Sequence, residues 1–165
     1  MFSSSISLSS CLYLRSIAHS ALLCTDILRF SLVNDDRRRN KRAEIIVEKK
    51  TFQGTGKEVL NSGVGHISET AKIGGEGNCV LCGHNGSRYG TFFTPLNQVK
   101  SGDEVQILDK EGQKHIYEVT GTDVIAPNDN SIKAQGKDKE LTLFTCAEKG
   151  TRRFVVKCRY KGGSE

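Results

Sequence analysis

From residue 44 onward, apolar and polar residues alternate over short runs separated by Gly, Asn and Asp. An alternation with a period of two is typical of strands that bury one face. The predicted strands cover 44–52, 78–84, 104–109, 115–125, 141–146 and 153–160. Because no long amphipathic helix interrupts them, the pattern predicts an all-β fold, a closed or nearly closed barrel with short helices or loops.

The segments between these strands carry weaker signals. Residues 58–66 begin like one helical turn, and residues 90–99 predict a short helix or loop broken by Pro95. Residues 127–139 form a polar loop. The short turns after 109 and after 146 predict two hairpins, 104–125 and 141–160.

Residues 1–43 do not conform to this pattern, and the β-barrel domain is expected over 44–161. The apolar stretch near 17–33 is interrupted by Asp26 and Arg29, whereas a membrane-spanning helix needs about 20 predominantly apolar residues. No Lys or Arg precedes Leu12, which disfavours a signal peptide. The N-terminal segment is therefore expected to be irregular, either disordered or aberrant.

Composition and charge narrow the classes of function. The 165 residues, 36% hydrophobic and 26% charged, suit one globular domain and exclude a polytopic membrane protein. The net charge of +5 comes mainly from residues 1–50, which hold nine basic and five acidic residues. A nucleic-acid partner is not expected, because a basic footprint should lie on the folded part.

The six cysteines are expected to be mostly unpaired thiols, since a domain of this length can bury its own core. Cys79 and Cys82, followed by His84, suggest a zinc or redox site as one alternative. Positions i and i+3 of a strand face opposite sides, so both thiols could not reach one metal ion. The sequence therefore predicts no metal and no cofactor.

Three residues near strand ends carry the candidate chemistry: His84, Cys146 and Arg153. If the strands 141–146 and 153–160 pair across their hairpin, Cys146 and Arg153 lie opposite each other; a slip of one residue would substitute Arg152. A thiolate is a nucleophile, an imidazole can protonate a leaving amine, and a guanidinium can hold an oxyanion. The combination suits acyl transfer through a thioester.

The residues around this triad resemble the sortase family. The run LTLFTC followed by RFVV is similar to the sortase signature, in which a strand ends in Thr-Leu-x-Thr-Cys and Arg begins the next. Residues 83–105, beginning Gly-His, resemble the family's histidine segment, and residues 63–84 fit its lead-in. The resemblance covers roughly residues 50–160 and implies the eight-stranded sortase barrel.

The resemblance also implies roles and partners. Cys146 would attack the Thr–Gly carbonyl of an LPXTG-like sorting signal, His84 would move the protons of the two amines, and Arg153 would steady the thioacyl intermediates. Thr145 would help to bind substrate. The acceptor would be an amine of a cell-wall peptide or a pilin, at the extracytoplasmic face of a bacterial membrane. The spanning helix that anchors the family is not evident in this chain.

Several alternatives stay open. Residues 1–43 do not contain the proline-containing entry strand of the family, which suggests that they are a truncated or aberrant reading of a longer sortase gene. The barrel would then lack an edge strand. A truncated chain could be an inactive sortase, and a non-catalytic barrel could only bind a peptide. A papain-like peptidase is disfavoured, because there Cys precedes His in the sequence. A coupled Cys–His pair would set the pH optimum of an active enzyme.

Overall fold

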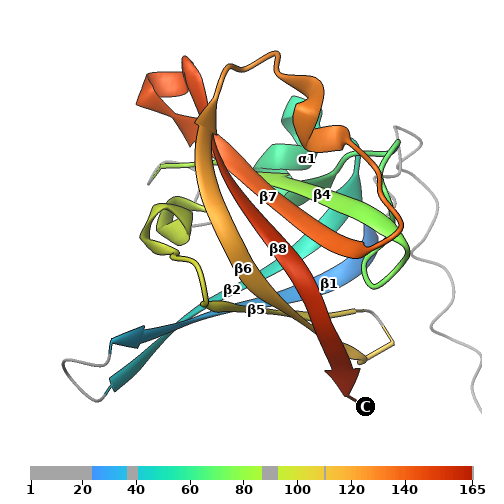
Figure 1. The fold of residues 1–165 in the computed structure, drawn as a ribbon. Helices are drawn as coiled ribbons and strands as arrows, with labels where there is room; N and C mark the ends of the chain where they lie inside the picture. Colours follow the sequence, from blue (N-terminus) through green and yellow to red (C-terminus); the bar gives the residue numbers. More distant parts are fainter. Residues whose placement is uncertain (1–23, 37–40, 87–92, 110, 165) are drawn as a thin grey trace, which may run out of the picture.

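The computed structural model describes residues 24–36, 41–86, 93–109 and 111–164, with side chains between residues 50 and 163. Eight strands form a closed barrel in the order β1-β2-β3-β4-β7-β8-β6-β5 (Figure 1), which confirms the predicted all-β class. The strands are β1 Cys24–Asp36, β2 Lys41–Gln53, β3 Val64–His66, β4 Gly77–Gly83, β5 Glu104–Leu108, β6 Lys114–Ile125, β7 Lys139–Ala147 and β8 Arg152–Ser164.

The helical elements are short and lie between strands. They are α1 Lys57–Ser62, and the 3-10 turns η2 Thr94–Gln98, η3 Asn130–Lys133 and η4 Glu148–Gly150. Pro95 stands in the first turn of η2, where its missing N–H costs nothing. Within the described ranges, no helix is long and apolar enough to cross a membrane.

The strand β1 lies where the sequence predicted none. It pairs antiparallel with β2 along most of its length and with β5 through Ser31–Gln106, Leu32–Val105 and Val33–Glu104. The expected missing edge strand is therefore a wrong prediction for this barrel, because β1 closes it. Asp26 and Arg29 interrupt the apolar pattern enough to hide the strand. Residues 1–23 lie outside the described part of the chain, and the domain boundary at residue 44 stays a prediction.

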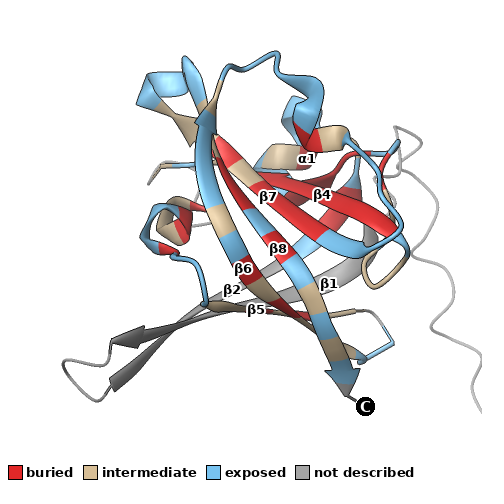
Figure 2. Ribbon diagram, in the orientation of Figure 1, coloured by how far each residue is buried: buried red, intermediate tan, exposed pale blue. Residues whose placement is uncertain are grey.

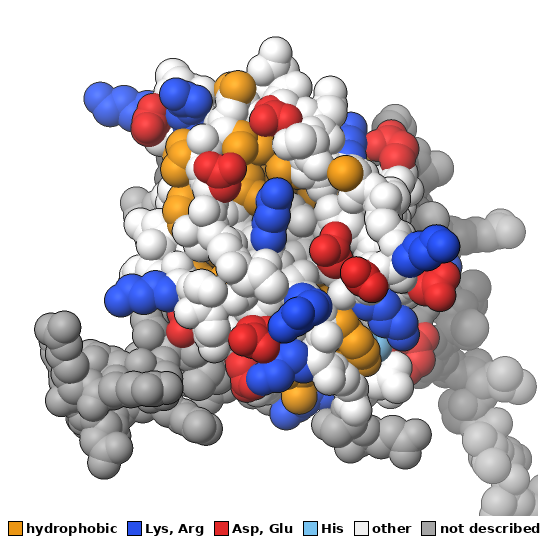
Figure 3. Space-filling view, in the orientation of Figure 1, with side chains coloured by type: hydrophobic (Ala, Val, Ile, Leu, Met, Phe, Trp, Pro, Cys, Tyr) orange, Lys and Arg blue, Asp and Glu red, His pale blue; other side chains and the backbone are white. Residues whose placement is uncertain are grey.

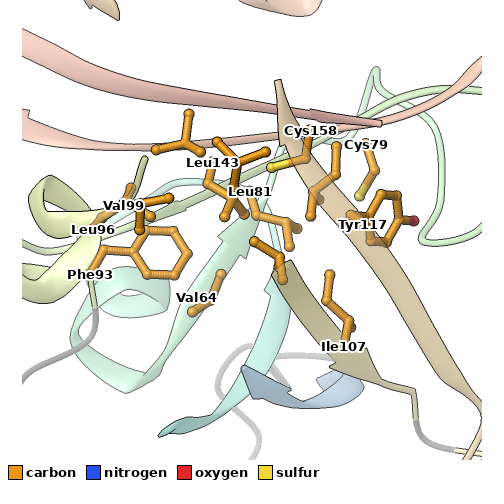
Figure 4. Close-up of a cluster of buried hydrophobic side chains, with 14 residues drawn as sticks. Val64, Cys79, Leu81, Phe93, Leu96, Val99, Ile107, Tyr117, Leu143 and Cys158 are labelled. Atoms are coloured by element: carbon orange, nitrogen blue, oxygen red, sulfur yellow. The ribbon is translucent and has the colours of Figure 1, made fainter. Parts of the chain in front are cut away.

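The core fills the inside of the barrel, and its described side chains come from strands β3 to β8 and from the segment around η2. Buried and less buried positions alternate along β5 and the first half of β6, whereas every residue of β4 is buried, so both faces of β4 are covered (Figure 2). The interior cluster includes Tyr117 and Ile107, packed together with Leu81 and Leu143 (Figure 4). The opposite face of the same strands carries a smaller buried cluster of Ile67, Val80, Ile132 and Val155.

Strand directions bring three distant segments to one edge. The strands β4 and β7 are parallel neighbours, with Gly83 opposite Thr145. The antiparallel partner β8 begins where β7 ends, and Cys146 lies opposite Arg153. Parallel neighbours place their carboxyl ends at the same edge of a sheet, so the residue that follows β4 lies beside the end of β7.

Candidate active site

The structure brings together the three residues that the sequence singled out. His84 directly follows β4, Cys146 lies near the end of β7, and Arg153 lies at the start of β8. Cys146 and Arg153 are register partners in the β7–β8 pair. All three line one open cavity of about 480 Å³. The predicted juxtaposition is therefore present, although the three residues are separated by up to 69 positions in the chain.

The alternation of side chains explains why Cys146 and Arg153 share a face. Val155 belongs to the buried cluster outside the barrel interior, Phe144 packs against that cluster, and each lies two positions from a site residue on its strand. Two positions along a strand return to the same face, so Cys146 and Arg153 also face outward. The neighbouring Phe154 packs on the interior cluster instead.

The backbone at His84 is held from inside the barrel. Its carbonyl oxygen accepts a hydrogen bond of 3.1 Å from the backbone N–H of Phe93. Phe93 is buried, and its ring packs against the preceding Gly83, where a Cβ would lie only 3.0 Å from the ring. A larger residue at position 83 would push the ring or the strand away, so this glycine permits the packing that places His84.

Two side chains join the ends of β4 and β7. The Thr145 hydroxyl, only 2% exposed, donates a 2.7 Å hydrogen bond to the Gly83 carbonyl. The Asn85 amide donates a 2.8 Å bond to the Cys146 carbonyl. Sequence reasoning missed Asn85, whose only signal is its place next to His84. Thr145 lines the cavity as well, and its predicted role in substrate binding stays a prediction.

The register identifies which arginine faces the cavity. Arg153 lines it, and its Nη1 group donates to the carbonyl oxygens of Gly150 and Arg152 at 2.9 and 3.0 Å. Arg152 is instead exposed, with its Nε 3.9 Å from a carboxylate oxygen of Glu148. The slip that would have exchanged the two arginines has not occurred.

A second thiol lies in the same cavity. Cys82 is 3% exposed, and burial raises the pKa of its thiol to about 12, despite a backbone hydrogen bond to Gly65 that lowers it. Arg153 also lowers this pKa, and Cys82, Cys146 and Arg153 all line the same cavity. Cys82 therefore stays protonated near neutral pH, whereas Cys146 is a free, half-buried thiol.

The two cysteines of the zinc alternative face opposite sides of β4. Cys79 is fully buried in the interior cluster, whereas Cys82 lines the outer cavity, as strand alternation predicted. No group of three or more His, Cys, Asp or Glu side chains that could hold a metal ion occurs in the described part of the chain. Neither cysteine forms a disulfide.

The cavity has a floor of strands and two walls of loops. One wall follows β2 and β3, and the other comes from the β6–β7 connection that carries η3 (Figure 1). Apart from the triad, the lining includes Leu60, Ile67, Glu69, Cys82, Ile125, Pro127, Asp129, Ile132, Lys133 and Phe144. Glu69 and Lys133, one from each wall, approach to 3.5 Å.

The lining is mixed in character and the charges nearly balance. On the face shown in Figure 3, basic and acidic side chains are interspersed. A groove with an apolar floor and a few polar groups suits an extended peptide.

The chain matches a known family over most of its length. The family model described as the sortase domain matches residues 39–161. The chain belongs to the sortase family. Among curated relatives, Sortase A of Bacillus anthracis is 31% identical over 115 residues, covering 68% of this chain and 53% of that protein. The putative sortase YwpE of Bacillus subtilis (strain 168) is 39% identical over 85 residues, covering 50% of this chain and 82% of the relative.

Solved sortase structures share the fold. Sortase A of Listeria monocytogenes superposes with a TM-score of 0.67 at 26% identity, covering 84% of this chain and 90% of that one. The Sortase D5 transpeptidase of Clostridium perfringens gives 0.64 at 26% identity, covering 81% and 79%. This sortase spans about half the length of Sortase A of Bacillus anthracis.

Proposed function

We propose that this sortase is a cysteine transpeptidase that cleaves an LPXTG-like sorting signal and joins the released carbonyl to an amine. The observation that carries the proposal is the pairing of Cys146 with Arg153 beside His84 in one open cavity. A nucleophile, a proton carrier and a fixed cation at one site are the groups that thioester chemistry needs.

The first half-reaction would form a thioester. The Cys146 thiolate attacks the Thr–Gly carbonyl, and the developing oxyanion is stabilised by N–H groups of Arg153. The C–N bond then breaks as protonated His84 gives its proton to the departing Gly amine. The Arg153 guanidinium has five N–H donors, so its bonds to two backbone carbonyls leave others available.

The second half-reaction would return the enzyme to its starting state. Neutral His84 takes a proton from the incoming amine, which attacks the thioester carbonyl. The new amide forms as the C–S bond breaks and the Cys146 thiolate leaves. The acceptor would be an amine of a cell-wall peptide or a pilin at the extracytoplasmic face of the membrane. Water in place of the amine would give hydrolysis as a side reaction. No step requires a metal ion or cofactor.

Trapping the intermediate tests this proposal. Incubation of the full chain with an LPXTG-like peptide should add the mass of the acyl fragment to a peptide containing Cys146, detected by mass spectrometry. Cys146→Ala should fold and bind but form no adduct. Peptide binding without turnover in the unaltered chain would instead support the non-catalytic peptide-binding barrel or inactive sortase.

The pH dependence gives a second readout. Because the first half-reaction needs a Cys146 thiolate and a protonated His84 in the same molecule, the rate should rise and then fall as pH increases. A profile that is flat across both ionisations would contradict the pairing of Cys146 with His84.

A further inference from the structure

A buried amide at the start of β4 lies under one wall of the active-site cavity. Asn78 is only 5% exposed, although its side chain carries two donors and an acceptor. Burying an amide is unfavourable unless its polar atoms are hydrogen-bonded. Asn78 stands six positions before His84 on the segment that leads to it, which makes the identity of its partners relevant to the site.

The partners of Asn78 lie in the β6–β7 connection and in β7. Its Nδ2 donates to the carbonyl oxygen of Ile132 at 2.8 Å and, more weakly, to that of Ala134 at 3.4 Å. Its Oδ1 accepts a 2.9 Å bond from the Thr142 hydroxyl, which orients the amide. The Asn78 side chain thus links β4 to the β6–β7 connection, whose residues 130–134 are not part of a strand.

Gln135 completes the attachment from the loop side. Its Oε1 accepts from the backbone N–H of Asn78 at 2.9 Å, and its Nε2 donates to the Asn78 carbonyl at 3.1 Å. The same Nε2 also donates to the Lys133 carbonyl at 2.9 Å. The Gln135 side-chain amide therefore bonds both the backbone N–H and the backbone carbonyl of Asn78, as a residue of a neighbouring strand would. These bonds fix the distance of the loop from the barrel.

The segment fixed in this way is a wall of the active-site cavity. The side chain of Ile132 lines the cavity and is buried against Val80 and Val155, while its carbonyl is held by Asn78. The neighbouring Lys133 also lines the cavity and reaches Glu69 of the other wall. Moving the loop by even one ångström would change the width of the groove beside Cys146.

We propose that Asn78 is a positioning residue of the transpeptidase: it fixes the wall formed by η3 so that the groove is formed before substrate binds. This inference rests on the proposed function. Asn78 would not contact the substrate, and its bonds would not change the chemistry at Cys146. Its loss should therefore weaken binding of the sorting peptide and leave the bond-breaking steps nearly intact.

The test compares full-chain variants with an LPXTG-like peptide. Asn78→Ala should raise KM about tenfold, since a buried hydrogen-bonded amide is lost, and should change kcat less than about threefold. Thr142→Val removes only the bond that orients the amide and should have a smaller effect. The matched control is Thr120→Val, which removes a hydroxyl hydrogen bond to the Lys157 carbonyl on β8 and leaves the hydrogen bonds of Asn78 and Gln135 to the wall in place.

Two measurements separate the failure of this inference from the failure of the proposed function. Alkylation of Cys146 by iodoacetamide should be unchanged in Asn78→Ala, because the small reagent does not need the groove. Limited trypsin cleavage after Lys133 and Lys137 should be faster than in Thr120→Val, whether or not the peptide is a substrate. Gln135→Ala, at an exposed position, should reproduce the effect if Asn78→Ala fails to fold.

Each outcome decides the proposal. If the peptide is a substrate, a raised KM with normal alkylation of Cys146 supports a positioning role. If no peptide is turned over, faster trypsin cleavage of the loop is by itself enough to support it. An unchanged KM overturns the proposal. A combined loss of kcat, of Cys146 alkylation and of stability also overturns it, because it would assign Asn78 to general packing. Equal cleavage rates in Asn78→Ala, Gln135→Ala and Thr120→Val overturn it as well.

Discussion

The two faces of β4, β7 and β8 use the same residue type in opposite ways. On the interior face, Cys79 and Cys158 are buried among aliphatic side chains, and burial raises the pKa of the Cys158 thiol well above its ordinary value. On the outer face, Cys146 is half-buried beside a histidine and an arginine in an open cavity. The pleat of the strands alone decides which thiols face the core and which face the groove.

This contrast separates packing from chemistry. A buried neutral thiol behaves as a small hydrophobic group, whereas a thiolate near cationic groups is a nucleophile. Cys82 lies between the two cases, because it lines the groove but is almost fully buried, and burial raises its pKa to about 12. Substitutions on the two faces should therefore affect different measurements.

The largest expected contrast is between Cys146→Ala and Cys158→Ala. Loss of the proposed nucleophile should reduce the proposed transpeptidation by on the order of 10³-fold or more while leaving the melting temperature nearly unchanged. Loss of the interior thiol should reduce the free energy of unfolding by about 1 kcal/mol and leave kcat unchanged. Peptide turnover and thermal unfolding measure the two effects. Equal activity losses would remove the distinction between the faces.

The next contrast concerns the two arginines that begin β8. Arg153→Ala should lower kcat by roughly 10²-fold to 10³-fold, because the cavity loses the cation that would hold the oxyanion. Arg152→Ala should lower kcat by less than about threefold, since Arg152 is exposed and only weakly paired with Glu148. Steady-state kinetics on both variants shows which of the two arginines contributes to turnover. A larger effect at Arg152 would show that the wrong arginine has been assigned.

A smaller effect should appear in the pH dependence of stability. Because burial raises the pKa of Cys158 in the folded chain, the unfolded chain binds fewer protons above its ordinary pKa of 9.0. The free energy of unfolding must then fall as pH rises, by about 1.4 kcal/mol at pH 10 relative to pH 7 for this thiol. Urea unfolding of Cys158→Ala should show a correspondingly shallower decline. Parallel curves for the two proteins would contradict the assignment of this decline to Cys158.

The smallest effect should come from the ion pair that spans the groove. Glu69 and Lys133 are 75% and 41% exposed, so Glu69→Gln should change the free energy of unfolding by less than about 0.5 kcal/mol. Its effect on KM should be less than about twofold, far below that of Asn78→Ala. Kinetics at low and high salt would test this ranking. If Glu69→Gln raised KM more than Asn78→Ala does, the ion pair and not Asn78 would hold the wall in place.

The sequence predicted the parts of the molecule that depend on local pattern. Strong alternation defined β7 and β8, and the hairpin between them fixed the pairing of Cys146 with Arg153. Parallel placement of β4 beside β7 was not predicted from alternation, because pairing between segments about 60 residues apart leaves no local signal. The position of His84 near Cys146 came from the family resemblance.

The missed features depend on contacts that are distant in sequence. The strand β1 was hidden by charged residues within its apolar run, and its pairing with β5 joins segments more than 70 residues apart. The attachment of the η3 loop depends on Asn78, which lies 54 residues from Ile132. Amides occur at many surface positions, so only its burial in the fold distinguishes this one.

The completed pairing of β4, β7 and β8 constrains how a peptide can be recognised. Each of these strands has a hydrogen-bonded neighbour on both sides, so none offers a free edge to which an incoming chain could add as an extra strand. A ligand at this site must therefore lie above the sheet, against the side chains and loops that line the cavity. Discrimination between sequences then depends on the shape of pockets, and main-chain addition contributes nothing at these three strands.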